Sequence, residues 1–424
     1  MPRMRVSIVS LTLVCLAAAC GGGGDERRAA APASSPPAAT EPEQPRRDAL
    51  AGGPHPALLV TQAHFVERVG ADGKKASVPG PARLVIVRDT GSGWKQVVVD
   101  DPDSNVMHKA VPWDGGVLTI AANQAMLRVW RFANGAWTAD THWNPKFGGR
   151  FDRLRDFETG DVDGDGKDEI VIATHDQGVI AVVHPDEGWK VDEVDRTPTT
   201  FVHEIEIGDI DGDGTPEFFA TPSKPNKLDQ EQPGEVVMFR RDGDGWTKSV
   251  VDAPGDTHAK EILATDVDGD GTSELYVVWE GAVGEGGTLL RPVTIKGYRW
   301  ANGAPTSSVV GTVPDRQMRA IQAGDANGDG SVDLVAGALA TGLYLFEQKG
   351  DGWSRALIDA DSSGYEHPVH LADLDQDGTS EVYVASEDQG ELRRYVWNGT
   401  DFTKSVVMPL GAGDITWNVT DARL

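Results

Sequence analysis

Hydrophobic and polar residues alternate over short runs along most of the chain, a period of two that is typical of β-strands. Four such runs, separated by turn residues, make up a unit. In one unit the runs are residues 154–160, 169–174, 178–185 and 189–195. A Gly-Trp pair often introduces the last run, at Trp94, Trp189, Trp246 and Trp353. We interpret these tryptophans as packing residues between neighbouring sheets, because they recur at one position per unit.

The units are marked by an Asp-x-Asp-x-Asp-Gly pattern, in which Asn once replaces the second Asp. Its first aspartates are Asp161, Asp209, Asp266, Asp325 and Asp373, at spacings of 48, 57, 59 and 48 residues. Degenerate copies at Asp114 and Asp421 bring the number of units to seven. Seven units of four short strands predict an all-β fold, a seven-bladed β-propeller. An open solenoid of stacked repeats is the alternative architecture.

The two ends of the repeat region favour a closed ring. The first unit, residues 57–100, lacks the strand that precedes the aspartate in the other units. The C-terminal segment ITWNVTDA has the pattern of that missing strand. We therefore predict one propeller over residues 57–424, closed by a C-terminal strand.

The amino terminus has the pattern of an export signal rather than of a folded element. Residues 1–19 place two arginines before an uninterrupted small and apolar run, and Cys20 follows. The small residues before Cys20 resemble the bacterial lipobox, which implies lipidation of Cys20; a plain signal peptide is the alternative. Residues 20–56 are rich in Ala, Pro, Ser and Gly and are expected to form a disordered tether. We expect an exported bacterial lipoprotein, held only by its lipid anchor at the outer membrane or cell surface, or facing the periplasm.

Composition narrows the classes of partner. The chain of 424 residues has 66 acidic and 39 basic residues and a formal net charge of -27, which disfavours nucleic acids and anionic lipid surfaces. The two cysteines, Cys15 and Cys20, lie in the signal region, so the folded part has neither a disulfide nor a thiolate metal site.

The aspartate loops have the donor pattern of a calcium site. Carboxylates at positions 1, 3 and 5 converge where glycines let a loop curl, position 7 offers a backbone carbonyl, and position 9 adds a carboxylate. Many hard oxygen donors with irregular geometry suit Ca²⁺ better than Mg²⁺. The predicted ligands are Asp161, Asp163, Asp165, Lys167 and Glu169; Asp209, Asp211, Asp213, Thr215 and Glu217; Asp266, Asp268, Asp270, Thr272 and Glu274; Asp325, Asn327, Asp329, Ser331 and Asp333; Asp373, Asp375, Asp377, Thr379 and Glu381.

An EF-hand begins with a similar pattern but needs a glutamate at position 12 and flanking helices. Position 12 is apolar in every loop here, and a strand follows. The loops therefore predict about five Ca²⁺ sites in β-hairpins, with acidic turns that hold no ion as the alternative. Asp114 and Asp421 lack the partner carboxylates and are expected to be metal-free.

The segments GDVDGDGKDEIVIA, GDIDGDGTPEFFA and GDANGDGSVDLVAG resemble FG-GAP/VCBS repeats, the units of integrin α-type seven-bladed propellers. The resemblance covers about residues 105–424 well and residues 57–100 weakly. It implies a calcium-bearing propeller of a kind often used for adhesion or as an accessory to surface enzymes.

A ring of basic residues and histidines is predicted six positions before the anchor aspartates. Its members are His108, Arg155, His203, Lys260, Arg319 and His367. They are expected at one mouth of the central channel, on the face that also carries insertions at residues 64–80, 222–234 and 280–292. Three interpretations remain open: pairing with adjacent glutamates, binding of an anionic group, or acid–base catalysis by a histidine.

These features support two hypotheses of function. The first is a calcium-stabilised, monomeric surface propeller that binds an unknown protein or glycan ligand, without catalytic residues. The second is a polysaccharide lyase or related carbohydrate-active enzyme that uses the basic, histidine-bearing face, since some propeller lyases resemble this layout. The sequence predicts no nucleic acid partner under either hypothesis.

Overall fold

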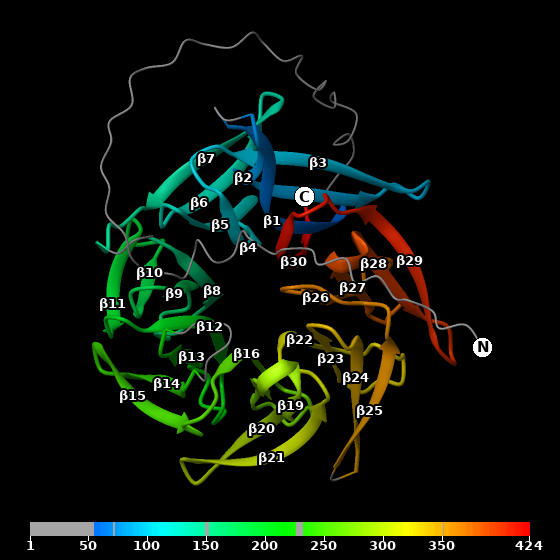
Figure 1. The fold of residues 1–424 in the computed structure, drawn as a ribbon. Coiled ribbons are helices and arrows are strands. Elements are labelled where there is room, and N and C mark those ends of the chain that lie inside the picture. The colour runs from blue at the N-terminus through cyan, green and yellow to red at the C-terminus, as the bar shows by residue number, and fades with distance from the viewer. Residues whose placement is uncertain (1–54, 71–72, 149–151, 226–231, 351) are drawn as a thin grey trace, which may run out of the picture.

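A computed structural model describes residues 55–70, 73–148, 152–225, 232–350 and 352–424. Within these ranges, seven four-stranded antiparallel sheets surround a central channel (Figure 1). The predicted all-β, seven-bladed propeller is therefore confirmed, as a closed ring rather than an open solenoid. The predicted signal peptide and Cys20 lie outside the described residues, as does the predicted tether up to residue 54.

Each blade is a meander that runs outwards from the channel. Blade 1 contains β30 (Ile415–Arg423), β1 (Pro56–Val69), β2 (Lys75–Asp89) and β3 (Trp94–Asp101), and blade 2 contains β4 (Val106–Trp113), β5 (Gly116–Ala122), β6 (Leu127–Ala133) and β7 (Ala136–Trp143). Blade 3 contains β8 (Leu154–Gly160), β9 (Glu169–Thr174), β10 (Val179–His184) and β11 (Lys190–Arg196), and blade 4 contains β12 (Phe201–Gly208), β13 (Glu217–Ser223), β14 (Val236–Asp242) and β15 (Gly245–Asp252).

The remaining blades follow the same order. Blade 5 contains β16 (Ala259–Thr265), β17 (Glu274–Trp279), β20 (Val293–Ala301) and β21 (Ala304–Val313), with an inserted hairpin of β18 (Ala282–Val283), η1 (Glu285–Gly287) and β19 (Leu289–Arg291). Blade 6 contains β22 (Met318–Gly324), β23 (Asp333–Ala338), β24 (Leu343–Lys349) and β25 (Gly352–Asp359), and blade 7 contains β26 (Val369–Ala372), β27 (Glu381–Ser386), η2 (Glu387–Gln389), β28 (Glu391–Trp397) and β29 (Phe402–Pro409). No helix in the described ranges has the length and apolar character to cross a bilayer.

The two ends of the propeller meet in blade 1. β30 is its innermost strand and pairs antiparallel with β1, from Ala57 opposite Ala422 to Ala63 opposite Ile415. This pairing confirms the predicted closing strand. It joins the first and last strands of the propeller by backbone hydrogen bonds, so the ring has no open edge.

The core lies between adjacent blades, where the second strand of each sheet is covered on both faces. β9, β13, β17, β23 and β27 are buried along their whole length, which explains their nearly continuous apolar sequences. Trp353 of blade 6 packs edge-on against Tyr276 of blade 5, with ring centroids 5.8 Å apart. Trp94 packs in the same way against Tyr383 of blade 7, at 6.2 Å, which agrees with the predicted packing role of these tryptophans.

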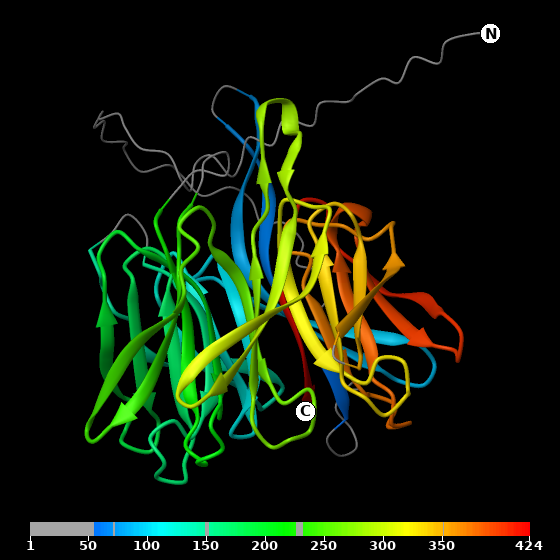
Figure 2. The same cartoon turned by 90° about the horizontal axis from the view of Figure 1, so that it is seen from below.

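The ring has two distinct faces. Each innermost strand starts at one face, which we call the channel-mouth face, and ends in an aspartate loop at the other, the aspartate-loop face. Two hairpins project from the channel-mouth face, the long end of β1 and β2 and the β18–β19 hairpin (Figure 2). They correspond to the predicted insertions at residues 64–80 and 280–292. Of the third predicted insertion, residues 222–234, the structure describes residues 222–225 and 232–234.

Candidate functional site

The aspartate loops form compact turns in which backbone amides hold the first carboxylate. Asp161 accepts hydrogen bonds from the amides of Gly164 and Gly166, both at 2.8 Å. Glu169 closes the loop from the start of β9, where one carboxylate oxygen accepts from the Val162 amide at 3.2 Å. The same arrangement recurs in the other four loops, at Asp209, Asp266, Asp325 and Asp373. The loop glycines adopt positive φ, as at Gly164 (79°) and Gly166 (87°), which lets the turn curl so tightly.

Ligand-type oxygen atoms converge in these loops. Three carboxylates of the Asp161 loop, at positions 1, 3 and 5, place oxygens within 4.8 Å of one another. The loops at Asp209 and Asp373 do the same, and in the Asp266 loop the position-9 glutamate takes part. The second oxygen of Glu169 is buried and has no hydrogen-bond partner among the described residues. Nδ1 of His184 of β10 lies 3.5 Å from this oxygen and is the one nitrogen among the converging ligand-type atoms of the described residues. The carboxylate oxygens, which dominate these groups, fit a hard divalent cation such as Ca²⁺.

In blades 4, 5 and 7, the third strand adds a side chain that the sequence analysis did not identify. Arg240 of β14 lies 2.9 Å from Asp211 and 2.7 Å from Glu217, and Arg299 of β20 likewise contacts Asp268 and Glu274. Arg394 of β28 contacts both Asp375 and Glu381. In each of these loops, an arginine therefore neutralises the carboxylates at positions 3 and 9.

The Asp325 loop differs in the sign of this third-strand charge. Position 3 is Asn327, whose amide donates to the carboxylate of Glu347 of β24 at 3.2 Å. Burial, together with the neighbouring Asp329, raises the pKa of Asp333 to about 7. Glu347 thus places a carboxylate beside Asn327, and this carboxylate also pairs with Lys349 at 3.0 Å. A comparison of the third-strand positions between repeats would have shown this exchange in the sequence.

The two degenerate anchors form ion pairs instead of carboxylate clusters. Asp114 is bound by Arg131 of β6 at 2.7 Å, and Asp421 lies 3.0 Å from the imidazole of His370. Neither aspartate belongs to a group of converging metal-type ligands within the described ranges.

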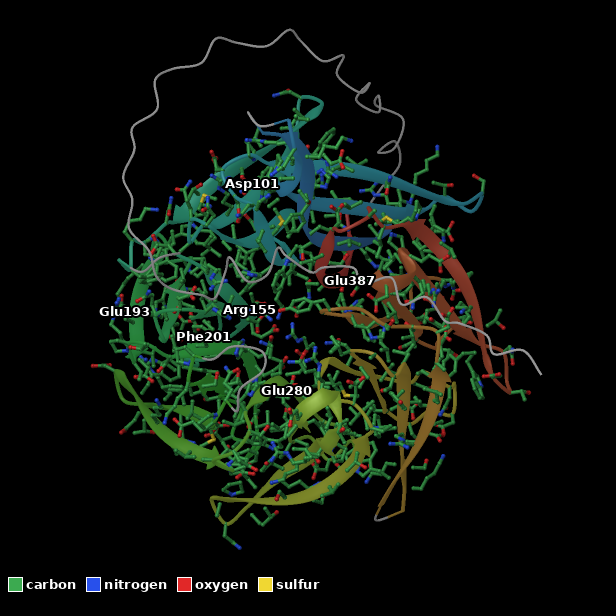
Figure 3. All side chains as sticks on the ribbon, in the orientation of Figure 1. Asp101, Arg155, Glu193, Phe201, Glu280 and Glu387 are labelled. Atoms are coloured by element: carbon green, nitrogen blue, oxygen red, sulfur yellow. The ribbon has the colours of Figure 1, made fainter. Side chains whose placement is uncertain are left out.

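The predicted ring lies at the channel mouth. Its arginines are linked to one another by acidic residues that come from other blades. Arg155 lies 3.4 Å from Glu204 of the next blade and 3.8 Å from Glu366, which precedes β26 on the far side of the channel. Arg319 binds the same Glu366 at 2.6 Å. The guanidinium of Arg155 also lies over the ring of Trp417, 5.1 Å from its centroid. An ion-pair network thus spans the channel at this depth. Figure 3 labels Arg155 on the channel side of blade 3.

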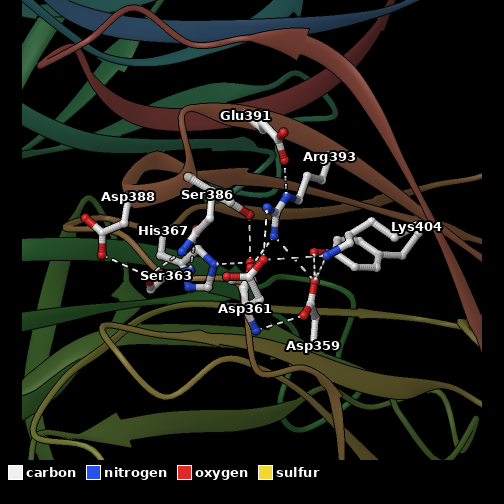
Figure 4. Close-up of polar contacts among 12 residues, drawn as sticks. Asp359, Asp361, Ser363, His367, Ser386, Asp388, Glu391, Arg393 and Lys404 are labelled. Carbon is white, nitrogen blue, oxygen red and sulfur yellow. Dashed lines mark hydrogen bonds and ion pairs between the residues drawn. The ribbon is translucent and has the colours of Figure 1, made fainter. Parts of the chain in front are cut away.

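The three histidines of the ring are buried and neutral. Burial lowers the pKa of His108 and His203 well below the usual range and that of His367 to about 4. His108 lies 2.6 Å from the backbone oxygen of Leu154. Both nitrogens of His367 are engaged, one with the backbone oxygen of Ala338 at 2.8 Å and one with the Ser362 hydroxyl at 2.7 Å (Figure 4).

Lys260 and Glu280 are the ionisable groups of the mouth whose charges are least balanced by their neighbours. The amino group of Lys260 lies 3.0 Å from Nδ1 of His203, and burial, aided by Arg319, lowers the pKa of Lys260 to about 7. Glu280 starts the β18–β19 insertion and is 3% exposed, yet neither carboxylate oxygen has a hydrogen-bond partner among the described residues. Burial raises the pKa of Glu280 to about 8. Groups that titrate near neutral pH inside a concave face are typical of functional sites.

The sequence analysis missed several residues that define the mouth. Glu366 links two ring arginines, Trp417 lies between His108 and Arg155, and Glu387 of η2 lies at the channel edge. Burial raises the pKa of Glu387 to about 7. These residues share no fixed offset from the anchor aspartates, so repeat spacing gives no signal for them.

Three segments of the chain, residues 161–220, 209–277 and 325–384, match the family described as FG-GAP-like repeat. Together they include all five complete aspartate loops. The protein is an FG-GAP repeat propeller. No curated protein gives a sequence match to it.

Solved structures share the fold of this FG-GAP repeat propeller at low sequence identity. A putative 6-phosphogluconolactonase from Bacteroides fragilis NCTC 9343 matches with a TM-score of 0.51 and 12% identity, over 86% of this chain and 98% of that one. A putative 6-phosphogluconolactonase from Bacteroides uniformis ATCC 8492 matches with a TM-score of 0.54 and 13% identity, over 86% and 99%. Similarity at this level supports the propeller architecture alone.

Proposed function

We propose that this FG-GAP repeat propeller is a calcium-stabilised module, held at a membrane through lipidated Cys20, that binds a protein partner across its channel-mouth face. The observation that carries the proposal is the pair of hairpins on that face, whose side chains include exposed apolar groups. A propeller with FG-GAP repeats is consistent with a ligand-binding module, and the position of the hairpins points to the face that binds.

The calcium part of the proposal rests on the five loops. Asp, Asn and Glu side chains at positions 1, 3, 5 and 9 would hold the ion, together with the backbone carbonyl at position 7. A bound Ca²⁺ supplies positive charge that lets the clustered carboxylates remain ionised. It would also fix the turn between the innermost strand and the second strand, and so support the scaffold that carries the channel-mouth face.

The binding part rests on apolar surface in an unusual place. Leu290 of the β18–β19 hairpin is 70% exposed and Val69 at the end of β1 is 67% exposed. Val283 and Leu289 add further exposed apolar surface to the β18–β19 hairpin. Exposed apolar groups gathered on projecting hairpins are typical of protein interaction sites. At the base of the β18–β19 hairpin, the carboxyl group of Glu280 has no hydrogen-bond partner among the described residues, and a rearrangement on binding would let it bond to a polar group of the partner.

Site-specific photo-crosslinking in the native host tests the partner. A photoreactive amino acid at Leu290 or at Val69 should give the same discrete adduct, because both positions face one bound partner. The matched control is Val309, which is 60% exposed on the outer strand β21 and should give no such adduct. The proposed binding face is wrong if the hairpin positions give no adduct, or give the adduct found at Val309.

The contact between Lys260 and His203 favours a second candidate function, acid–base chemistry on a carbohydrate. The pKa of Lys260, at about 7, would allow its amine to accept a proton near neutral pH. Incubation with a panel of uronate polymers should then release unsaturated products, and Lys260→Met should abolish their release. If no polymer yields such products, this second candidate is eliminated.

A further inference from the structure

A cleft of about 630 Å³ opens between blades 2 and 3, on the aspartate-loop face. Its lining includes Trp113 at the end of β4, Arg131 of β6, His142 of β7, and Asp168 and Trp189 from the loops of blade 3. It is remote in the fold from the channel-mouth face, and none of its lining residues belongs to the predicted ring.

The cleft exists because blade 2 has lost its aspartate loop. Elsewhere, loops of adjacent blades touch: a Cβ added to Gly164 would lie 3.4 Å from the Thr215 hydroxyl, and one added to Gly328 would lie 3.1 Å from that of Thr379. In blade 2 the loop is reduced to the tight turn Asp114–Gly115, with both residues at positive φ. The space that a full loop would fill is left open against blade 3.

Trp189 packs against the hydrophobic cluster between blades 2 and 3, as the other repeated tryptophans pack against theirs, but it lies in a different backbone setting. Trp246 and Trp353 lie within outer strands, whereas Trp189 precedes β11 in a longer turn. Its φ of 65° is rare for a bulky residue and marks backbone strain, which is concentrated at functional sites. Trp189 stacks on His142 of blade 2, with ring centroids 3.6 Å apart and ring planes 11° apart. The strained turn thus positions an indole at the wall of the cleft.

The polar groups of the cleft offer both donors and acceptors. Nε2 of His142 is buried and has no hydrogen-bond partner among the described residues. Asp168 is exposed, while Arg131 is held in place by Asp114 at 2.7 Å. A pyranose ring presents apolar C–H groups on its faces and hydroxyl groups at its edge. Half-exposed indoles with fixed polar side chains around them match that combination.

Charge decides which saccharides fit. Three carboxylates, those of Asp114, Asp168 and Asp186, line the cleft, and the only cation among its lining residues is Arg131. Lys167 of the adjacent loop pairs with Asp186. An anionic sugar would therefore meet net negative charge. We propose that the cleft between blades 2 and 3 binds a neutral oligosaccharide, with Trp189 as its aromatic contact.

Titration of the full propeller in the presence of Ca²⁺ tests this site. The probes are neutral oligomers of glucose, mannose, galactose and xylose, with uronate oligomers and a basic peptide as comparison ligands, followed by isothermal titration calorimetry. At least one neutral oligomer should bind, and Trp189→Ala should weaken its affinity by about tenfold or more. Trp189→Phe should retain part of the affinity, because it keeps an aromatic face.

Further variants separate this site from other effects. Trp353→Ala removes a repeated tryptophan that packs between blades 5 and 6, and the affinity should stay at the wild-type value. Asp168→Asn changes an exposed side chain with little risk to folding, and should weaken binding several-fold even if Trp189→Ala fails to fold. Glu280→Gln, at the channel mouth, should not alter oligosaccharide affinity, so this test is independent of the proposed partner face. The proposal is overturned if no neutral oligomer binds at millimolar concentration, if uronates or the peptide bind in preference, or if Trp189→Ala or Asp168→Asn binds as tightly as the wild type.

Discussion

On the aspartate-loop face each complete aspartate loop is built within one blade, whereas on the channel-mouth face charged side chains pair between blades. Asp209 to Glu217 form one loop, and Arg240, which contacts two of its carboxylates, comes from the same sheet. At the mouth, Glu366 of blade 7 is shared by Arg155 of blade 3 and Arg319 of blade 6. Local sites can be lost one at a time, as happened at Asp114. Shared sites depend on closure of the whole ring.

The most severe test of this comparison is removal of the strand that closes the ring. Deletion of residues 414–424 removes β30 and leaves the apolar side chains of β1, including Leu58 and Val60, without the cover of Val419. We expect loss of cooperative folding, measured by circular dichroism and thermal melting. Deletion of residues 21–50, which precede the propeller, is the control and should leave the melt unchanged. Retention of the wild-type melt by the shortened chain would show that β30 is dispensable.

Removal of Ca²⁺ tests the aspartate-loop face as a whole. A ligand that binds only the folded state, present at 100 times its Kd, stabilises that state by about 2.7 kcal/mol per site. EDTA should therefore lower the melting temperature strongly, and Ca²⁺ should restore it more effectively than Mg²⁺. Asp209→Asn should reduce this Ca²⁺-dependent shift, whereas Asp114→Asn, at a degenerate anchor, should not. An unchanged melt in EDTA, with no calcium by elemental analysis, would contradict the calcium sites.

Single-loop variants test the opposite third-strand charges. Glu347→Gln removes the carboxylate that replaces the one absent at Asn327, and should weaken one Ca²⁺ site by about tenfold. Arg299→Gln removes a cation that competes for Asp268 and Glu274, and should strengthen a different site. Calorimetric titration with Ca²⁺ resolves both effects. If both variants bound Ca²⁺ more tightly than the wild type, or both bound it more weakly, the assigned role of these side chains would be refuted.

The smallest effect is expected at the channel mouth, as a pH dependence of stability. The folded-state pKa values of Glu280, about 8, and Glu387, about 7, lie above the ordinary value of 4.5. The folded protein therefore binds more protons than the unfolded chain over this range, so these groups reduce stability as the pH rises from about 5 to 8. The buried histidines and Lys260, whose folded-state pKa values are lowered, act in the opposite direction. The expected result is therefore a difference: across this pH range, the melting temperature of Glu280→Gln in Ca²⁺ should rise by a few degrees relative to that of the wild type. An equal pH slope in wild type and variant would show that Glu280 does not titrate as expected.

The sequence alone predicted the architecture because its information is local and repeated. The alternation of apolar residues defines each strand, and the anchors at Asp161, Asp209 and the later repeats define the blades. The closing strand could be predicted since the first unit lacks what the last residues supply. The aspartate loops were equally visible, because nine consecutive residues contain all the ligands that the sequence predicted for each loop.

Only the tertiary structure decided which residues share a site across blades. Glu366 and Trp417 meet Arg155 because the ring closes, and no periodicity relates their positions in the chain. The exposure of Trp189 at a cleft depends on a backbone angle and on an absent loop in the neighbouring blade. Sequence periodicity determines what recurs in every blade, whereas packing around a closed ring determines where one blade differs from the next.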